Sequence, residues 1–227
     1  MTSLNGFKAM LFDLDNTLLN RDEAVDRLFF KLVKLCYGDV DHTIKNEMRQ
    51  KFREYDGKYF GQSDKTDVVA SFFDEFPPQN GMPKQAIQDF WNHHFPQCFA
   101  VHQDTITIIH RIKQQVKVGI ITNGSLERQK AKIAYTNLDR CFDMVIISEE
   151  VGWSKPDKRI FEMALKRLDV NPEETLFVGD DLEKDIDGCQ QANIKGVWFN
   201  PSMRKNDTTF QPFAEIHSLE SLVSYVT

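Results

Sequence analysis

The chain has 227 residues, of which 41% are hydrophobic and 27% are charged, enough for one large domain or for a core domain with a smaller insert. Its formal net charge of −6 excludes the strongly basic surface typical of nucleic-acid-binding proteins, so we expect no nucleic-acid partner. No apolar run approaches the ~20 residues of a membrane span, and residues 1–6 do not resemble a signal peptide. We therefore expect a cytoplasmic protein that has no membrane partner.

The first apolar run covers residues 7–12 and predicts a short buried strand. Asp13 and Asp15 follow it directly, and the alternation of side chains along a strand places both on one face. Two carboxylates in one small volume repel each other unless a cation lies between them or one carries a proton. Mg²⁺ prefers oxygen ligands and would remove the conflict. The alternative is an ordinary turn, since Asp, Asn and Thr are common turn residues.

The next block, residues 19–100, has the pattern of an all-helical domain. Apolar residues recur at helical spacing, and Gly and Pro separate four predicted helices, at residues 21–36, 43–55, 64–76 and 84–95. A helical block inserted directly after a strand that carries site residues is expected to form a cap domain. Most of its aromatic side chains should pack its interior, with one or two facing the site. We therefore place the cap domain at residues 19–100 and the core at residues 1–18 and 101–227.

Beyond residue 103, helices and strands alternate. Strands are predicted at residues 117–122, 144–147, 175–178 and 196–199, and helices at residues 104–115, 126–136, 157–168, 183–192 and 218–225. Such alternation, with strands rich in Val and Ile, indicates a parallel sheet with helices on both faces. The fold class is therefore α/β, with a doubly wound, Rossmann-like core. The polar segment 200–212 is expected to be a long loop near the site.

Two candidate phosphate-binding positions follow from the strand ends, because parallel strands all end at one edge of a sheet. Thr122 and Asn123 stand before a predicted helix, where a hydroxyl and free amides suit a phosphate. The alternative is an ordinary helix start with Ser125 as its N-cap. Lys155 precedes Pro156, which keeps it outside the following helix, where its ammonium group could meet a phosphate.

A third candidate, at the strand that ends near residue 178, is a set of carboxylates. Gly179 allows a sharp turn, and Asp180, Asp181 and Asp185 follow within six residues. Asp180 is the predicted direct ligand of a divalent cation. Asp185 would orient that ligand or bind the cation through water, and Asp181 would do the same or serve as a helix N-cap.

In this order, the motifs Asp13–Thr17, Thr122, Lys155 and Gly179-Asp180 with Asp185 resemble those of the haloacid dehalogenase superfamily. The likeness covers nearly the whole chain, since that family inserts a helical cap where residues 19–100 lie. The segments 121–124, 147–152 and 155–156 further resemble the branch that contains pyrimidine 5'-nucleotidases and sugar-phosphate phosphatases.

The resemblance implies a Mg²⁺-dependent phosphomonoesterase that acts on a small phosphorylated metabolite, either a nucleoside monophosphate or a sugar phosphate. Asp13 would be the nucleophile that forms an aspartyl-phosphate, and Asp15 the general acid and then base. Asp13, the backbone carbonyl of Asp15 and Asp180 would hold Mg²⁺. Thr122, with the backbone of Asn123, would bind the phosphoryl group, and Lys155 would neutralise charge.

Three alternatives to a phosphomonoesterase use related motifs. A phosphomutase uses the same aspartate pair but returns the phosphoryl group to the substrate, and an inactive member of the family would only bind ligands. Dehalogenating relatives lack the second aspartate, so Asp15 argues for phosphoryl transfer. The sequence leaves open the substrate and whether the protein is a monomer or a homodimer.

Overall fold

The computed structural model describes residues 6–62 and 64–226. The chain forms two compact units. The core unit comprises the residues up to Leu19 together with those from Val101 onward, and the cap unit is Asn20–Ala100. No helix among the described residues is long and apolar enough to cross a membrane.

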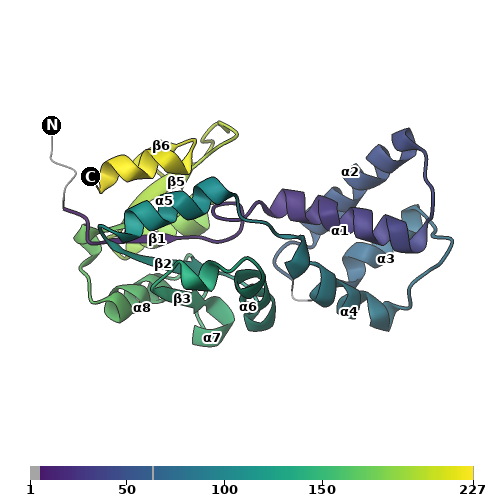
Figure 1. The fold of residues 1–227 in the computed structure, drawn as a ribbon, viewed down its shortest axis with the longest axis horizontal. Coiled ribbons are helices and arrows are strands. Elements are labelled where there is room, and N and C mark those ends of the chain that lie inside the picture. Colours follow the sequence, from purple (N-terminus) through teal and green to yellow (C-terminus); the bar gives the residue numbers. More distant parts are fainter. Residues whose placement is uncertain (1–5, 63, 227) are drawn as a thin grey trace. The chain divides into compact units, whose positions relative to one another are not determined.

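A six-stranded parallel sheet forms the centre of the core unit, in the order β3-β2-β1-β4-β5-β6 (Figure 1). The strands are β1 (Ala9–Phe12), β2 (Lys117–Thr122), β3 (Met144–Ile147), β4 (Thr175–Gly179), β5 (Lys195–Phe199) and β6 (Ala214–Ile216). All four residues of β1 are buried, as are all five of β4. Near-continuous apolar runs of this kind are typical of central strands in a sheet covered on both faces.

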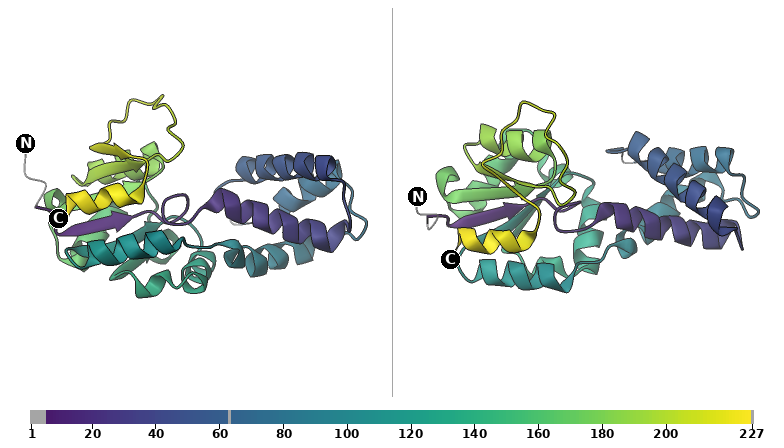
Figure 2. Two further views of the ribbon diagram at one scale, coloured as in Figure 1. Left: turned by 45° about the horizontal axis from the view of Figure 1, so that its top comes forward. Right: turned by 90° about the horizontal axis from the view of Figure 1, so that it is seen from above.

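Helices cover both faces of this sheet. The core helices are α5 (Gln103–Lys113), α6 (Leu126–Tyr135), α7 (Ser148–Val151), α8 (Lys158–Leu168) and α9 (Gly188–Gln191). In the right panel of Figure 2, α5 and the C-terminal turns lie on one side of the sheet, and the green helices lie on the other. The side chains of α8 enter a buried cluster with Leu11, Ile146 and Phe177. The predicted doubly wound α/β core is confirmed.

Some elements of the core differ from the prediction. The strand β6 is new, and its first two residues are not buried, so the periodic signal is weak. The predicted helix 183–192 starts as a π-helical turn at Leu182–Asp187 and continues as α9. The last predicted helix is a 3₁₀-helix at Leu219–Tyr225.

The described residues of the cap unit form four α-helices and a 3₁₀-helix: α1 (Arg21–Cys36), α2 (His42–Lys58), α3 (Thr66–Glu75), α4 (Lys84–His94) and the 3₁₀-helix Pro96–Cys98. Their buried faces meet in an aromatic cluster in which Phe52 contacts Phe29, Phe72 and Trp91. These four side chains are fully buried. The expectation that most aromatic residues pack the interior of this unit is confirmed, while Phe30 and Phe60 are exposed.

Candidate active site

The site lies at the carboxyl end of β1, the strand at which the chain order of the sheet reverses. β1 pairs with β2 on one side and with β4 on the other. The crevice beside such a reversal is where open α/β sheets bind their ligands. The backbone N–H of Asp13 still donates to the carbonyl of Val178 (2.9 Å), so Asp13 is fixed as if it were one more residue of the strand. The residues that follow β1, β2 and β4 therefore converge.

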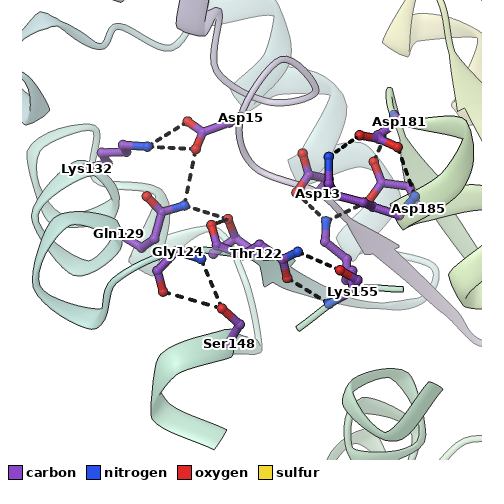
Figure 3. A network of polar contacts seen from close by, with 12 residues as sticks. Asp13, Asp15, Thr122, Gly124, Gln129, Lys132, Ser148, Lys155, Asp181 and Asp185 are labelled. Carbon is purple, nitrogen blue, oxygen red and sulfur yellow. Dashed lines mark hydrogen bonds and ion pairs between the residues drawn. The ribbon is translucent and has the colours of Figure 1, made fainter. Parts of the chain in front are cut away.

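Three carboxylates and one ammonium group meet at this point. Asp13, Asp180 and Asp185 each offer an oxygen, and these oxygens lie within 4.8 Å of one another. Lys155 Nζ donates to Asp13 Oδ1 (2.5 Å) and to Asp185 Oδ1 (2.6 Å), as Figure 3 shows. Lys155, Asp13 and Asp185 are buried. The sequence-predicted Asp13, Lys155 and Asp180 thus come together, with Asp185 as a full member of the group.

The electrostatics of this group show an excess of negative charge. Burial raises the pKa of Asp13 well above its ordinary value, and Asp185 and Asp180 add to the rise, while Lys155 opposes it. Burial and the neighbouring Asp185 raise the pKa of Asp180 to about 7. Burial alone would lower the pKa of Lys155, but Asp13 and Asp185 together raise it. Lys155 is therefore a permanent cation that does not by itself compensate its three acidic neighbours.

The donor set fits a hard divalent cation. When ionised, three carboxylates around one ammonium leave two surplus negative charges, and carboxylate oxygens are the ligands that Mg²⁺ prefers. Gly179 allows the Asp185 carboxylate to lie close to the end of β4, since a Cβ at this position would lie 2.3 Å from Asp185 Oδ2. Sequence reasoning placed Asp185 behind Asp180, and in the structure each of these residues has a carboxylate oxygen within 4.8 Å of the other and of Asp13.

Neighbouring residues hold Asp180 and Asp181 in place. The carbonyl of Asp180 accepts hydrogen bonds from Trp198 Nε1 and Arg204 Nη2, both at 3.0 Å. Arg204 belongs to the loop predicted at residues 200–212, which does reach the site. Asp181 Oδ1 accepts from the backbone N–H groups of Glu183 (3.1 Å) and Lys184 (2.9 Å), so its role is that of a helix N-cap.

Asn123 fixes the position of Lys155. Its side-chain Nδ2 donates to the Lys155 carbonyl, and its Oδ1 accepts from the Lys155 N–H, each at 2.8 Å. The Asn123 side chain thus ties the end of β2 to the loop before α8. Thr122, the predicted phosphate-binding residue, is buried beside it.

Asp15 lies apart from the carboxylate group, contrary to the expectation that it shares a face with Asp13 (Figure 3). The strand ends at Phe12, and a tight turn follows in which Asn16 has a φ of 63°. Strand alternation therefore no longer applies at Asp15. Its carboxylate accepts from Lys132 Nζ at 2.9 Å (Oδ1) and 2.7 Å (Oδ2), and Gln129 Nε2 lies 3.3 Å from Oδ2.

Sequence reasoning missed Gln129 and Lys132. Both lie on α6, three residues apart, and both are buried together with Ile133. Two polar residues on the buried face of an amphipathic helix are the signal that could have found them.

The helix start at α6 is secured by residues that follow β3. Ser148 Oγ accepts from the Gly124 N–H (3.0 Å), and Glu149 Oε2 accepts from the Leu126 N–H (2.7 Å). Ser125 stands at the N-cap position, but its side chain makes no capping hydrogen bond and instead accepts from Arg128 Nε (3.0 Å). Two of the amides predicted for a phosphate, those of Gly124 and Leu126, thus have partners within the protein.

Comparison with known proteins identifies the family. The haloacid dehalogenase-like hydrolase family matches residues 10–199. The chain is 25% identical over 224 residues to the HAD-hydrolase YfnB of Bacillus subtilis, covering 95% of this chain and 94% of the relative. It is 28% identical to the pyrimidine 5'-nucleotidase PynA of Streptococcus pneumoniae (96% and 94% covered), and 30% identical to the glyceraldehyde 3-phosphate phosphatase of Pyrococcus furiosus (85% and 80% covered).

Solved structures share the fold. A magnesium-bound crystal structure of YfnB from Bacillus subtilis matches with a TM-score of 0.73 and 24% identity, covering 95% of this chain and 96% of that one. A dehalogenase structure matches with a TM-score of 0.72 and 19% identity, with 96% of each chain covered. The fold, the order of the site residues along the chain and the family match agree. This chain belongs to the haloacid dehalogenase-like hydrolases, in the branch that contains pyrimidine 5'-nucleotidases and sugar-phosphate phosphatases.

Proposed function

We propose that the chain is a Mg²⁺-dependent phosphomonoesterase that acts through an aspartyl-phosphate on Asp13. The observation that carries the proposal is the placement of Lys155 between Asp13 and Asp185, with Asp180 beside them and Asp15 held separately. This arrangement supplies a nucleophile, a cation and a second carboxylate for proton transfer, the groups that phosphoryl transfer from an ester requires.

Each residue has a distinct part in the reaction. One oxygen of the Asp13 carboxylate attacks phosphorus, and the bond from phosphorus to the ester oxygen breaks. Protonated Asp15 gives its proton to the departing alkoxide, which leaves as an alcohol. Asp15, now a carboxylate, takes a proton from water as the water oxygen attacks phosphorus. The bond to Asp13 then breaks, phosphate is released, and both aspartates return to their starting forms.

Lys155 and Thr122 serve the phosphoryl group during both steps. The buried Lys155 ammonium already neutralises part of the charge on Asp13, and it would do the same for the transferring group. Thr122 would donate its hydroxyl hydrogen to a phosphoryl oxygen. Asp13, Asp180, Asp185 and the backbone carbonyl of Asp15 would hold Mg²⁺, which when bound screens the repulsion between nucleophile and phosphate.

The relatives support a small phosphorylated metabolite as the substrate. PynA is named a pyrimidine 5'-nucleotidase, and two further relatives are named for glyceraldehyde 3-phosphate and ribulose-1,5-bisphosphate. A nucleoside monophosphate or a sugar phosphate is therefore the proposed substrate class. The presence of Asp15 favours this over dehalogenation, because a departing halide needs no proton.

The test is the release of inorganic phosphate from pyrimidine nucleoside monophosphates, sugar phosphates and phosphoglycolate, with Mg²⁺ and with a chelator. We expect release that requires Mg²⁺ and is abolished by Asp13→Asn. Isomerised product without free phosphate would instead indicate a phosphomutase. If neither product forms, the chain is a binding protein and the proposal is wrong.

A further inference from the structure

We propose that Lys132 and Gln129 are positioning residues that hold the proton-transfer group Asp15 and the phosphate-binding Thr122 in one fixed relation. This inference rests on the proposed phosphomonoesterase function and adds to it a part of the site supplied by α6.

Lys132 forms a buried ion pair with Asp15. Its side chain is 5% exposed, and its ammonium group donates to both carboxylate oxygens of Asp15, at 2.9 and 2.7 Å. A buried ammonium is costly unless it is paired and hydrogen-bonded, and a two-oxygen contact restricts the rotation of the carboxylate. Lys132 therefore fixes both the direction and the plane of the Asp15 carboxylate, and when one oxygen carries the proton of the general acid, the ammonium group keeps its contact with the other.

Gln129 links this ion pair to the end of β2. Its amide Nε2 donates to Thr122 Oγ1 at 2.6 Å and to Asp15 Oδ2 at 3.3 Å, so one NH₂ group contacts both residues (Figure 3). Because Thr122 Oγ1 accepts from Gln129, its own hydroxyl hydrogen must point elsewhere. The intramolecular acceptor for that hydrogen, the Asn123 carbonyl, is at a long 3.5 Å. Gln129 thus orients Thr122 to donate, as a phosphoryl oxygen requires.

The helix itself makes this linkage rigid. Gln129 and Lys132 are three residues apart, a spacing that places them on the same face of α6, and both are buried. Glu149 secures the first turn of α6 by accepting from the Leu126 N–H. The acid–base carboxylate and the phosphate-binding hydroxyl, 107 residues apart in the chain (15 and 122), are therefore held by one helical face.

A purely structural ion pair and a positioning residue predict different kinetics. Loss of a structural ion pair lowers stability but affects all substrates alike. Loss of the positioning of a general acid affects most the substrates whose leaving group needs a proton, such as alkyl phosphates. Substrates that leave as a stabilised phenolate, such as 4-nitrophenyl phosphate, need it least.

The experiment compares Lys132→Met and Lys132→Gln with the wild type, on an alkyl phosphate and on 4-nitrophenyl phosphate, both with Mg²⁺. We expect kcat/KM, which reports the first phosphoryl transfer and not the later attack of water, to fall about 10- to 100-fold on the alkyl phosphate, a part of the 10²–10⁴ that acid–base catalysis contributes. On 4-nitrophenyl phosphate, kcat/KM should fall less than about tenfold. Lys132→Arg should restore most of the loss, since a guanidinium also binds a carboxylate at two oxygens. Lys132→Gln keeps a donor of similar length and serves if the Met variant does not fold.

Lys130→Met is the matched control on the same helix, because the Lys130 side chain is 60% exposed and its acidic partner Glu150 is 3.9 Å away. It should behave as the wild type. Equal losses of kcat/KM on both substrates, or no loss, in a folded Lys132 variant would overturn the inference while leaving the phosphatase intact. A wild type that releases no phosphate would instead overturn the proposed function and the inference with it.

Discussion

Asn123 and Lys155 are joined by two reciprocal hydrogen bonds, in which the side-chain amide of Asn123 both donates to and accepts from the Lys155 backbone at 2.8 Å. The contact links the carboxyl end of β2 to the turn before α8. The position of the Lys155 ammonium between Asp13 and Asp185 therefore depends on the Asn123 side chain, which bonds to the Lys155 backbone.

Asn123→Ala should therefore lower kcat, because the Lys155 backbone loses both partners and its ammonium group shifts relative to Asp13. A misplacement on the order of 1 Å costs up to about 10²-fold in rate. Steady-state kinetics on the best substrate measure this. Asn46→Ala, at an exposed position of α2, is the control. An unchanged kcat for Asn123→Ala would show that Lys155 is held by other contacts.

Gly179→Ala should disrupt cation binding more than folding. The added methyl group would lie 2.3 Å from Asp185 Oδ2, so the carboxylate must move away from Asp13 and Lys155. We expect the Mg²⁺ concentration for half-maximal activity to rise at least about tenfold, in the range found for loss of groups that orient metal ligands. Gly57→Ala, where the space around the Cβ position is open, is the control. Unchanged Mg²⁺ dependence would remove Asp185 from the cation site.

Mg²⁺ should stabilise the protein more strongly at higher pH. Burial raises the pKa of Asp180 from 3.8 to about 7, so between these values the cation-free folded state holds a proton that the unfolded state has lost. The contribution of Asp180 to stability therefore falls as pH rises through this window. Mg²⁺ competes with that proton. The increase in Tm on adding Mg²⁺ should thus grow from about pH 5 to about pH 8.

Asp180→Asn tests the assignment of this pH dependence, because an amide has no proton to lose in the window. The variant should show a smaller Tm increase with a flatter pH profile. A wild-type increase that is the same at both ends of the range would contradict the raised pKa of Asp180.

In the cap unit, Asp56→Ala should be strongly destabilising. Asp56 accepts from Arg21 through both oxygens (2.5 and 2.9 Å) and lies 3.8 Å from Lys65 Nζ, and all three residues are buried. Removing the carboxylate takes away the acidic group that the buried cations Arg21 and Lys65 share, at a cost of about 3–5 kcal/mol in stability. Arg53→Ala, which breaks an exposed pair with Asp26, should cost about 1 kcal/mol or less. Chemical denaturation measures both, and equal effects would contradict the argument.

The fold could be predicted from the sequence because the elements that pack most extensively also have the clearest apolar periodicity. The bounds of α1, β2 and β3 agree with the predicted ones, and each of these elements has a clear buried face. β6 was missed because a three-residue edge strand with one buried residue, Ile216, has no readable period.

The site was predictable where residues end or follow strands, and where a proline marks a helix boundary. Asp13 and Asp180 follow β1 and β4, Thr122 ends β2, and parallel strands share one edge. Lys155 was found because Pro156 keeps it outside the following helix. Asp15 was misplaced because the chain bends at Leu14, directly after β1, and strand alternation ends there. Lys132 could not be assigned because helical periodicity identifies a buried face but not the residue that this face meets.

Asp15→Asn, assayed with 4-nitrophenyl phosphate and Mg²⁺, separates the attack of Asp13 on phosphorus from the later attack of water. A good leaving group needs no acid, so phosphoryl transfer to Asp13 should proceed, whereas the attack of water should be slow without the carboxylate. We expect a burst of about one 4-nitrophenolate per active site, and a phosphoryl group on the peptide that contains Asp13 after acid quench. The absence of a burst, or a phosphoryl group on another residue, would contradict Asp13 as the nucleophile.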